Sequence, residues 1–357
     1  MGMTRLRGLV LYVHLSTALV AGAFIAILGI TGSIIAFEPE LDHLSHPHLS
    51  YVSPGGKLLT LQEIGDAVSR KFNGEPIVSY LLSESPDLSL EVVLPRGIVC
   101  VNQYTGEILG VRTRGQTVLG FARATHIRLA SGDVGRTIMQ WSGPAIIVSL
   151  ASGLYLWWPG KRFRIRSGWR SKGFWFDLHN SIGVFFFLPL LVVATTGTVI
   201  AFEDQAAMLL SKLSNPVQVR REIVAQREAP AGAEMITADQ AVAIALTQMP
   251  GAIAYRIQMP RYGGAYRVSL EDPRHKVVSG RNLITIDQYT GSVISSSRST
   301  ESSAGEMILA ANEAIHTGEI IGTPTRMLMW LTSVIVPVQV ASGLLVWWRR
   351  WKTPAGD

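Results

Sequence analysis

Residues 177–203 read DLHNSIGVFFFLPLLVVATTGTVIAFE. The interior of this stretch carries no acidic or strongly basic residue, and it is long enough for a helix to cross a hydrocarbon core of roughly 30 Å. A histidine, His179, nevertheless lies near its start. An ionisable residue inside a membrane-spanning helix is costly and usually functional. The stretch therefore predicts a transmembrane helix that carries a functional imidazole.

Further apolar blocks have the same character, and 48% of all residues are hydrophobic while only 16% are charged. The blocks are Leu9–Phe37, Ile138–Trp158, Phe174–Phe202 and Met327–Trp348. Each has the roughly 20 residues that a membrane-spanning helix needs. We expect an α-helical membrane protein with four transmembrane helices. The alternative, four buried helices in one large soluble core, fits such long apolar runs poorly.

Basic residues gather next to these blocks. Arg5 and Arg7 precede the first block, the link 159–173 reads PGKRFRIRSGWRSKG, and the tail 349–357 begins RRWK. These segments lie on one side if every block spans, and the positive-inside bias makes that side the cytoplasm. Both termini are therefore expected there. The net charge of +6 is a topology signal and does not indicate a nucleic-acid partner.

The chain contains one unit written twice. The matching segments are His14 and TGSIIAFE (31–38) with His179 and TGTVIAFE (196–203); VNQYTGEIL (101–109) with IDQYTGSVI (286–294); and His126, Arg136 and SGLYLWW (152–158) with His316, Arg326 and SGLLVWW (342–348). Their spacings are 165, 185 and 190 residues. Each unit predicts a helix out of the cytoplasm, an extracytoplasmic domain and a helix back. This order makes two parallel repeats related by a pseudo-two-fold axis along the membrane normal.

The segment between the spans of each unit predicts a small α+β domain. Leu59–Phe72 and Thr237–Met249 have helical periodicity, and three short β-type runs follow each of them. The last run of each domain contains the tight turn of a D/N-Q-Y-T-G motif.

A helix followed by strands that end in a D/N-Q-Y-T-G hairpin resembles the PepSY domain. With spans that carry a histidine and end in T-G-x-x-x-x-F-E, nearly the whole chain resembles the PepSY-associated transmembrane family. That family includes inner-membrane ferric-siderophore reductases, of which the ferrioxamine type is the most similar in layout. The resemblance implies a multi-pass protein of the bacterial inner membrane with two periplasmic PepSY-like domains.

The expected order of parts follows from the repeat. It is transmembrane helix 1 (1–37), the first periplasmic PepSY-like domain (38–117), an interfacial helix and transmembrane helix 2 (118–158), a basic cytoplasmic loop (159–173), transmembrane helix 3 (174–203), the second periplasmic PepSY-like domain (204–305), an interfacial helix and transmembrane helix 4 (306–348), and a cytoplasmic tail (349–357).

Four of the eight histidines obey the repeat. His14 and His179 each lie seven residues past a basic residue, so both lie roughly 10 Å up their helices from the cytoplasmic end. His126 and His316 precede the returning spans, near the outer surface. The pseudo-two-fold brings partners of equal depth together across a helix bundle, an arrangement that ligates haem iron axially. We therefore expect two b-type haems, an inner one on His14 and His179 and an outer one on His126 and His316.

Other interpretations of these histidines stay open. A neutral imidazole can simply hydrogen-bond to a neighbouring helix, and paired histidines can bind zinc or copper, although two imidazoles alone complete neither site. The single cysteine, Cys100, excludes a disulfide within the chain and a thioether-attached haem. His43, His46 and His48 have no counterpart in the second unit and are expected in an exposed loop, with transient iron contact as the minor alternative.

Charged residues at the outer ends of the spans are also matched. Arg136 and Arg326 are candidates to neutralise haem propionates, and snorkelling at the interface is the alternative. Glu38 and Glu203 end the first and third apolar blocks. A helix C-terminus disfavours an anion, so we expect these glutamates to be paired, in the first instance with those arginines.

Small residues and one irregularity complete the pattern. Ala18 and Gly183, one turn after the inner histidines, would leave room for a porphyrin face or for close helix packing. The second unit has His316-Thr-Gly, the form expected before the returning helix, whereas the first unit has His126-Ile-Arg. This difference makes His126 the least secure of the four ligands.

The expected function joins the haems to the resemblance. Electrons would come from a quinol or a cytoplasmic reductase, and the resemblance implies that the acceptor is a ferric siderophore on the periplasmic side. The chain would then be a haem-dependent membrane oxidoreductase of iron uptake, surrounded by membrane lipid. The alternative is a PepSY-type membrane sensor or inhibitory protein without redox turnover, which has no need of paired intramembrane histidines.

Overall fold

The computed structural model describes residues 2–83, 85–113, 117–160, 165, 168–169, 171–213, 233–260, 264–273 and 282–351. The chain forms two compact units. The helical unit comprises residues 1–38, 118–206 and 311–357, and the sheet unit comprises residues 39–117 and 207–310. Parts of the expected basic loop 159–173 and of the expected tail 349–357 lie outside the described residues.

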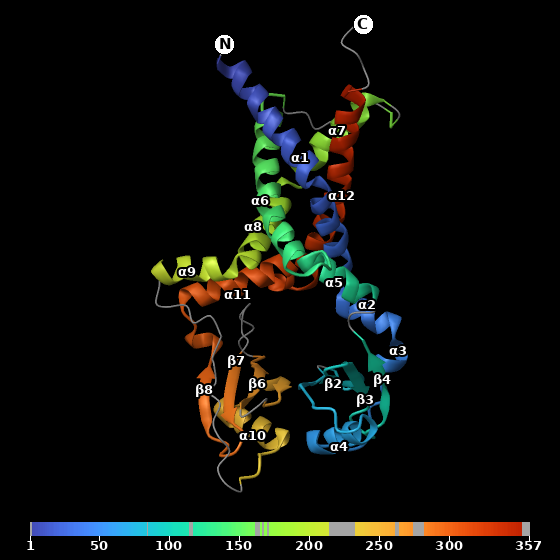
Figure 1. Ribbon diagram of the computed structural model, residues 1–357, viewed down its shortest axis with the longest axis vertical. Coiled ribbons are helices and arrows are strands. Elements are labelled where there is room, and N and C mark those ends of the chain that lie inside the picture. The colour runs from blue at the N-terminus through green and yellow to red at the C-terminus, as the bar shows by residue number, and fades with distance from the viewer. Residues whose placement is uncertain are drawn as a thin grey trace. The chain divides into compact units, whose positions relative to one another are not determined.

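The helical unit contains the candidate membrane spans (Figure 1). Its helices are α1 (Gly2–Ile35), α5 (Val118–Arg128), α6 (Gly132–Trp157), α7 (Lys172–Phe185), α8 (Phe187–Ala201) and α12 (Thr323–Trp351), together with the end of α11 (Ala304–Thr317). Arg5–Ile35 and Thr323–Arg349 are long and apolar enough to cross a membrane, and α7 with α8 form a third candidate if the pair is one span. Helix α6 is long enough but is not among these candidates, because polar residues interrupt its apolar run. The chain is therefore a membrane protein, and its other two expected spans stay predictions.

The long helices pack as a bundle in which the matched helices of the two repeats lie opposite one another. Helix α1 packs against both α6 and α12, α6 packs against α8, and α12 packs against α7. The matched helices, α1 and the α7–α8 pair, therefore lie diagonally across the bundle. This is the relation that a pseudo-two-fold axis between the repeats requires.

The matched helices that begin the two repeats differ in one respect. Helix α1 runs unbroken over 34 residues, whereas α7 and α8 meet at a 64° bend at Phe186. Pro189 explains the bend, because proline has no N–H for the carbonyl four residues earlier and its ring crowds that carbonyl. The matched position in α1 is Phe24, which preserves the helical hydrogen bond.

Glycines allow the closest helix crossings. A Cβ on Gly29 of α1 would lie 2.6 Å from Val336 Cβ and 2.8 Å from the Ser333 carbonyl oxygen of α12. In the other half, the contact between the matched positions has its glycine on the opposite helix: a Cβ on Gly143 of α6 would lie 3.4 Å from the Ala194 carbonyl oxygen of α8 and would also meet Thr198 Oγ1. Small residues at such crossings let membrane helices approach closely.

Replacing Gly29 tests this packing. Gly29→Ala is expected to destabilise the helical unit by roughly 1–3 kcal/mol, because α12 backbone must shift to admit the methyl group. The measurement is the thermal unfolding midpoint of the full chain in detergent. Gly22→Ala on the same helix is the matched control, since its Cβ would meet only Val340 Cγ1 at an ordinary 3.4 Å. Equal midpoints for the two variants would contradict the packing argument.

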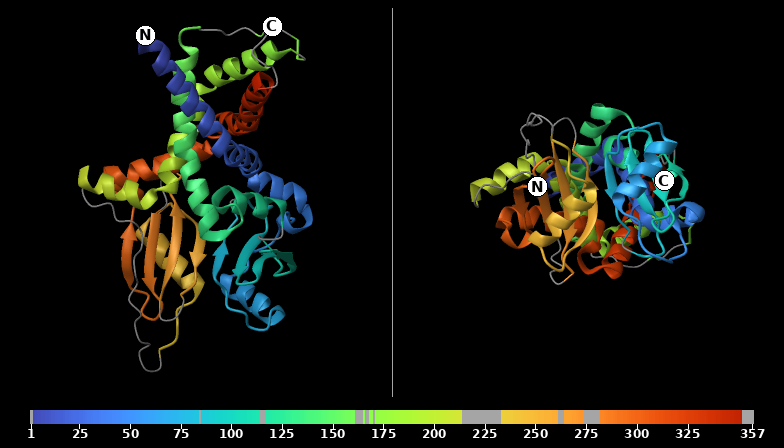
Figure 2. Two further views of the ribbon diagram at one scale, coloured as in Figure 1. Left: turned by 45° about the horizontal axis from the view of Figure 1, so that its top comes forward. Right: turned by 90° about the horizontal axis from the view of Figure 1, so that it is seen from below.

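The sheet unit contains one eight-stranded antiparallel sheet in the order β4-β3-β2-β1-β5-β6-β7-β8 (Figure 2). The strands are β1 (Ser79–Leu81), β2 (Leu90–Leu94), β3 (Gly97–Val101), β4 (Ile108–Arg112), β5 (Ile253–Gln258), β6 (Ala265–Glu271), β7 (Asn282–Asp287) and β8 (Val293–Ser297). The sequence predicts a separate domain in each repeat. The structure instead joins the two four-stranded halves edge to edge, with Tyr80 of β1 opposite Ile257 of β5.

A single hydrophobic core supports this sheet. Helices α4 (Leu61–Lys71) and α10 (Ala238–Gln248) cover it, and buried residues of both helices and of both halves of the sheet form one cluster. Each helix begins with a capping box, Thr60 with Glu63 in α4 and Thr237 with Gln240 in α10. These boxes satisfy the first free N–H groups of each helix.

The D/N-Q-Y-T-G motif is a turn device. Asn102 Oδ1 accepts the Tyr104 N–H at 2.9 Å, and Asp287 Oδ1 accepts the Tyr289 N–H at the same distance. The motif glycine has a positive φ of 74° in the first hairpin, which side chains rarely tolerate. The motif therefore marks a hairpin, and nothing in these contacts gives it a chemical role.

The two halves of the sheet unit also share a helix cap. The carboxylate of Asp239, in the first turn of α10, accepts the backbone N–H of Leu61 at 2.8 Å and that of Gln62 at 3.0 Å. Both donors belong to the first turn of α4, where the helix dipole favours a negative charge. Asp239 therefore ties the second repeat to the first.

Removing this shared cap is expected to loosen α4. Asp239→Ala should cost roughly 1–2 kcal/mol of stability in the sheet unit, because it leaves two helix N–H groups without their acceptor. Hydrogen exchange of the α4 amides in the full chain is the measurement, with faster exchange at the first turn as the expected result. Asp66→Ala, on the exposed face of α4, is the control. Unchanged exchange at Leu61 and Gln62 would refute the cap.

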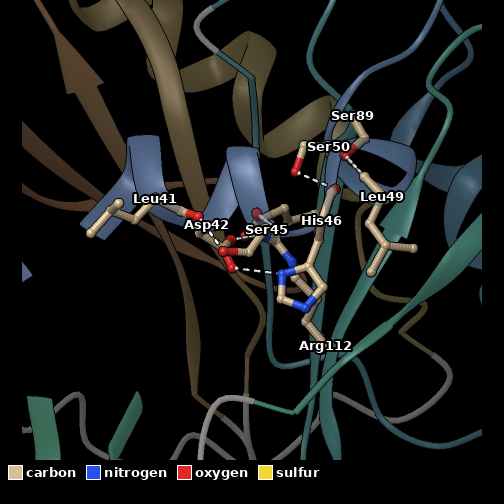
Figure 3. A network of polar contacts seen from close by, with 9 residues as sticks. Leu41, Asp42, Ser45, His46, Leu49, Ser50, Ser89 and Arg112 are labelled. Atoms are coloured by element: carbon tan, nitrogen blue, oxygen red, sulfur yellow. Dashed lines mark hydrogen bonds and ion pairs between the residues drawn. The ribbon is translucent and has the colours of Figure 1, made fainter. Parts of the chain in front are cut away.

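The segment with three histidines folds differently from the expected exposed loop. It forms helices α2 (Glu38–Ser45) and α3 (Pro47–Ser50), and Leu49 and Ser50 are buried. A polar network fastens it to the sheet (Figure 3).

Within that network, the buried Arg112 of β4 pairs with Asp42 of α2 and with Glu91 of β2. His46 Nδ1 lies 3.4 Å from Asp42 Oδ1. Among the described residues no three His, Cys, Asp or Glu side chains gather into a metal site, so His43, His46 and His48 do not form one.

Candidate functional site

The structure brings the inner histidine pair together in the helical unit. His14 on α1 and His179 on α7 come from diagonal helices, and their ring centroids lie 6.2 Å apart with an interplanar angle of 74°. Two imidazoles that share one metal through bonds of roughly 2 Å have their centroids about 6 Å apart. The spacing is therefore one that a single metal between the rings can bridge.

Hydrogen bonds at Nδ1 fix the tautomer of these rings. His14 Nδ1 lies 3.1 Å from the Ser149 carbonyl oxygen and 3.0 Å from Ser152 Oγ, both on α6. A carbonyl oxygen can only accept, so Nδ1 carries the proton and the lone pair is on Nε2. His179 makes the matched contacts on α12, to the Gln339 carbonyl oxygen and to Ser342 Oγ, each at 3.1 Å.

The outer histidines are held in the same way. His126 Nδ1 on α5 lies 3.0 Å from Thr31 Oγ1 on α1, and His316 Nδ1 on α11 lies 3.0 Å from Thr196 Oγ1 on α8. Thr31 Oγ1 already donates to the Ile27 carbonyl oxygen at 2.6 Å, so it is left to accept from the imidazole. Burial, and after it the charge of His316, lower the pKa of His126 to about 4. His126 is therefore neutral at physiological pH.

Each of the four rings also rests against a glycine. A Cβ would lie 3.2 Å from His14 Cε1 at Gly153, 3.0 Å from His179 Cε1 at Gly343, 3.2 Å from His126 Cε1 at Gly32 and 2.9 Å from His316 Cε1 at Gly197. Every one of these glycines directly follows the hydroxyl residue that bonds Nδ1. The repeated Ser-Gly and Thr-Gly pairs are therefore imidazole seats, with the hydroxyl as acceptor and the glycine as the space for the ring.

These seats are the functional residues that the sequence reading missed. The signal was present, because Thr31-Gly32 and Thr196-Gly197 lie within the matched segments that served only to define the repeat. Their role becomes visible once a histidine from another helix is placed beside each pair.

The Nε2 side of the rings is different in character. In the described part of the chain no hydrogen bond is found at Nε2 of His14, His126 or His316. His179 Nε2 lies 3.5 Å from Gln339 Nε2. Gln339 also occupies the space beside Gly183, where a Cβ would lie 2.7 Å from its Nε2. The room that the sequence predicts beside Gly183 is thus taken by a side chain.

Several buried polar atoms near the inner pair have no partner among the described residues. They are Ser149 Oγ, Gln339 Oε1 and Trp175 Nε1, the last one turn before His179 on α7. Beside the outer pair, Thr125 Oγ1 is in the same state. Buried polar groups are normally hydrogen-bonded, so these atoms are free to bond to a further group.

A family model described as the PepSY-associated TM region matches residues 11–350. The chain belongs to this family. The match spans all four repeated histidines and their hydroxyl–glycine seats. No curated protein matches the chain.

The first repeat lacks the glycine of the His-x-Gly form, but a glycine on the other side of the same contact takes its place. In the second repeat Gly318, with a φ of 82°, is the close-approach residue, since its Cβ would lie 2.7 Å from the Thr325 carbonyl oxygen. In the first repeat the matched position is Arg128, and the glycine lies at the other side of the contact, where a Cβ on Gly135 would lie 1.9 Å from the Arg128 carbonyl oxygen. His126 consequently has the same bond and the same kind of glycine contact as His316.

The matched arginines have different tasks. Arg326 Nη2 donates to the Ala36 carbonyl oxygen at 2.9 Å, and its guanidinium lies 4.7 Å from the Phe37 ring centroid. It therefore caps the C-terminus of α1. In the other half, Gln140 Nε2 caps the matched Ala201 carbonyl oxygen at 2.9 Å. Arg136 is exposed, and no hydrogen bond or ion pair is found for it within the described residues.

The glutamates at the span ends correct a sequence expectation. Glu38 begins α2 and Glu203 begins α9 (Glu203–Leu213), so each lies at a helix N-terminus, where the dipole favours an anion. Glu38 pairs with Arg123 of α5 and not with Arg136 or Arg326.

The unequal arginines give a paired test. Arg326→Ala is expected to lower the stability of the chain by roughly 1–2 kcal/mol, because a helix cap and a cation–π contact are lost. Arg136→Ala should leave it unchanged. The measurement is the thermal unfolding midpoint in detergent. A loss of the same size in both variants would show that the two arginines are equivalent after all.

Proposed function

We propose that the chain is a di-haem electron-transfer protein that reduces the iron of a ferric siderophore on the periplasmic side of the bacterial inner membrane. Electrons would be supplied by a quinol or a cytoplasmic reductase. His14 and His179 would ligate the inner b-type haem, and His126 and His316 the outer one. The observation that carries the proposal is the common setting of the four histidines. Each Nδ1 donates to an oxygen of another helix, and Nε2 has no hydrogen bond within the described chain at His14, His126 and His316, while at His179 it meets the amide of Gln339.

The residues present fit such a group. A ligating histidine normally donates its other ring N–H to an oxygen, which fixes the ring and raises its basicity. All four histidines do so. The 6.2 Å spacing of the inner rings suits one shared metal, and the unpartnered atoms beside them are available to a bound cofactor. When bound, haem supplies a one-electron carrier.

The competing metal interpretations are supported less well. Zinc needs four ligands, of which three or more come from the protein, and the described residues offer no third His, Cys, Asp or Glu near either pair. A macrocycle brings four equatorial nitrogens of its own, so two imidazoles suffice. A purely structural hydrogen bond accounts for Nδ1, but it does not account for two rings that face one another across the bundle.

The chain's own residues would set the environment of each group. Hydroxyls and carbonyls orient the imidazoles, glycines bring them close to the helix backbones, and the apolar helices exclude water. Arg136 is the arginine available to a propionate, because Arg326 already caps α1. The siderophore as acceptor rests on the family resemblance. With both termini in the cytoplasm, the sheet unit would be periplasmic, on the acceptor's side.

Haem stoichiometry of the purified full-length chain tests the proposal. We expect two b haems per chain by pyridine haemochrome, with a low-spin reduced-minus-oxidised spectrum. Replacing any one of His14, His179, His126 or His316 by alanine should lower the ratio from two to about one, since an axial ligand is lost from one site. His48→Ala, which changes an exposed histidine outside both pairs, is the control and should keep the ratio.

A chain that holds no haem when it is expressed with an ample supply of haem would refute the proposed reductase function. The alternative, a PepSY-type membrane sensor or inhibitory protein, would then be the better interpretation. The acceptor is tested separately. The reduced, haem-loaded chain should be reoxidised on mixing with ferrioxamine, while a ferrous chelator captures one Fe(II) per electron delivered. Haem that stays reduced in the presence of ferrioxamine would exclude that siderophore as substrate.

A further inference from the structure

Positions 149 and 339 are matched by the repeat, yet they carry different side chains. The backbone carbonyl of each accepts the Nδ1 proton of an inner histidine, so the two residues have the same main-chain role. Ser149 is small, whereas Gln339 is long enough to reach across to another helix. All other inner contacts are matched in kind: a serine hydroxyl at Nδ1 and a glycine at Cε1.

Gln339 extends from α12 onto α7, over the ligand-binding side of His179. Its Nε2 donates to the His179 carbonyl oxygen at 3.0 Å and lies 3.5 Å from His179 Nε2. The same amide fills the space beside Gly183. His14 has no such neighbour in the described part of the chain, because the Ser149 hydroxyl reaches no partner there.

The amide of Gln339 is poorly suited to a purely structural role. Its Oε1 is buried and has no hydrogen-bond partner among the described residues. An unsatisfied buried acceptor costs free energy, and an apolar side chain of the same size would fill the space beside Gly183 without that cost. The glutamine is thus held through its Nε2 alone, by a hydrogen bond of 3.0 Å to the His179 carbonyl oxygen and a longer one of 3.5 Å to His179 Nε2.

We infer that Gln339 is the gate of the inner site, a positioning residue that covers Nε2 of His179 until a ligand displaces it. The inference rests on the proposed function. The amide must leave before Nε2 can bond to a metal, so His14 is open from the start and His179 becomes available second. Gln339 therefore opposes occupation of the inner site, and the outer pair, with no counterpart of this residue in the described chain, fills without such opposition.

The test is haem uptake by the haem-free full chain in detergent, with hemin as the probe. His316→Ala removes the outer site, so that only the inner site titrates. In that background Gln339→Ser, which copies the first repeat, should bind hemin about fivefold more tightly and faster, because the hydrogen bonds from the glutamine amide to His179 no longer have to break. Ser149→Gln should weaken uptake to a similar degree by covering the His14 side.

Gln339→Leu separates the hydrogen bond from the bulk of the side chain. It keeps the space filled but makes no bond to the His179 carbonyl, so faster uptake than the parent is expected here too. A Gln339→Ser chain that binds hemin at the parent's rate and affinity, or more weakly, would overturn the gate. A wild-type chain that binds no haem at all would instead remove the proposed function, so the two failures are told apart by the wild-type stoichiometry.

Discussion

The hydrogen bond from an imidazole Nδ1 to an oxygen on another helix is the interaction on which the helical unit depends. It occurs four times and joins α1 to α5 and α6, α7 to α12, and α8 to α11. At the outer pair the hydroxyl has already donated within its own helix, and at the inner pair a carbonyl accepts, so each ring is held in one tautomer. A membrane interior offers no water to satisfy a ring nitrogen, so the positions of the histidines and the packing of the helices are fixed together.

The two repeats keep their contacts while exchanging the residues that make them. A close backbone approach requires that one Cβ be absent, and it is indifferent to which side lacks it. The α1–α12 crossing uses Gly29, whereas the matched α6–α8 crossing uses Gly143. In the same way, Arg326 caps the C-terminus of α1 and Gln140 caps the C-terminus of α8. A position-by-position comparison of the two repeats does not detect a contact that is kept by different residues. For this reason the sequence His126-Ile-Arg made His126 look like the least secure of the four ligands.

Features that depend on single residue types at a fixed spacing could be predicted from the sequence. The long apolar helices, the repeat and the capped hairpins are of this kind, and the structure brings His14 and His179 together as the pattern predicts. Other features leave little trace. The joined sheet rests on backbone bonds between β1 and β5, which any side chain permits. The break after α1 falls inside an apolar run that continues through Phe37, so Glu38 looked like a helix end when it is a helix start.

The hydroxyl–glycine seats also bear on how the two proposed sites compare. The two histidines of each pair have the same tautomer, the same kind of acceptor and the same glycine contact, so the two ligands of one proposed site have similar basicity. The repeat does not relate the inner pair to the outer pair. The inner rings donate to a backbone carbonyl oxygen, whereas the outer rings donate to a threonine hydroxyl, so the two proposed sites differ in the acceptor at Nδ1. Gln339 opposite Ser149 adds a difference between the two ligands of the inner pair.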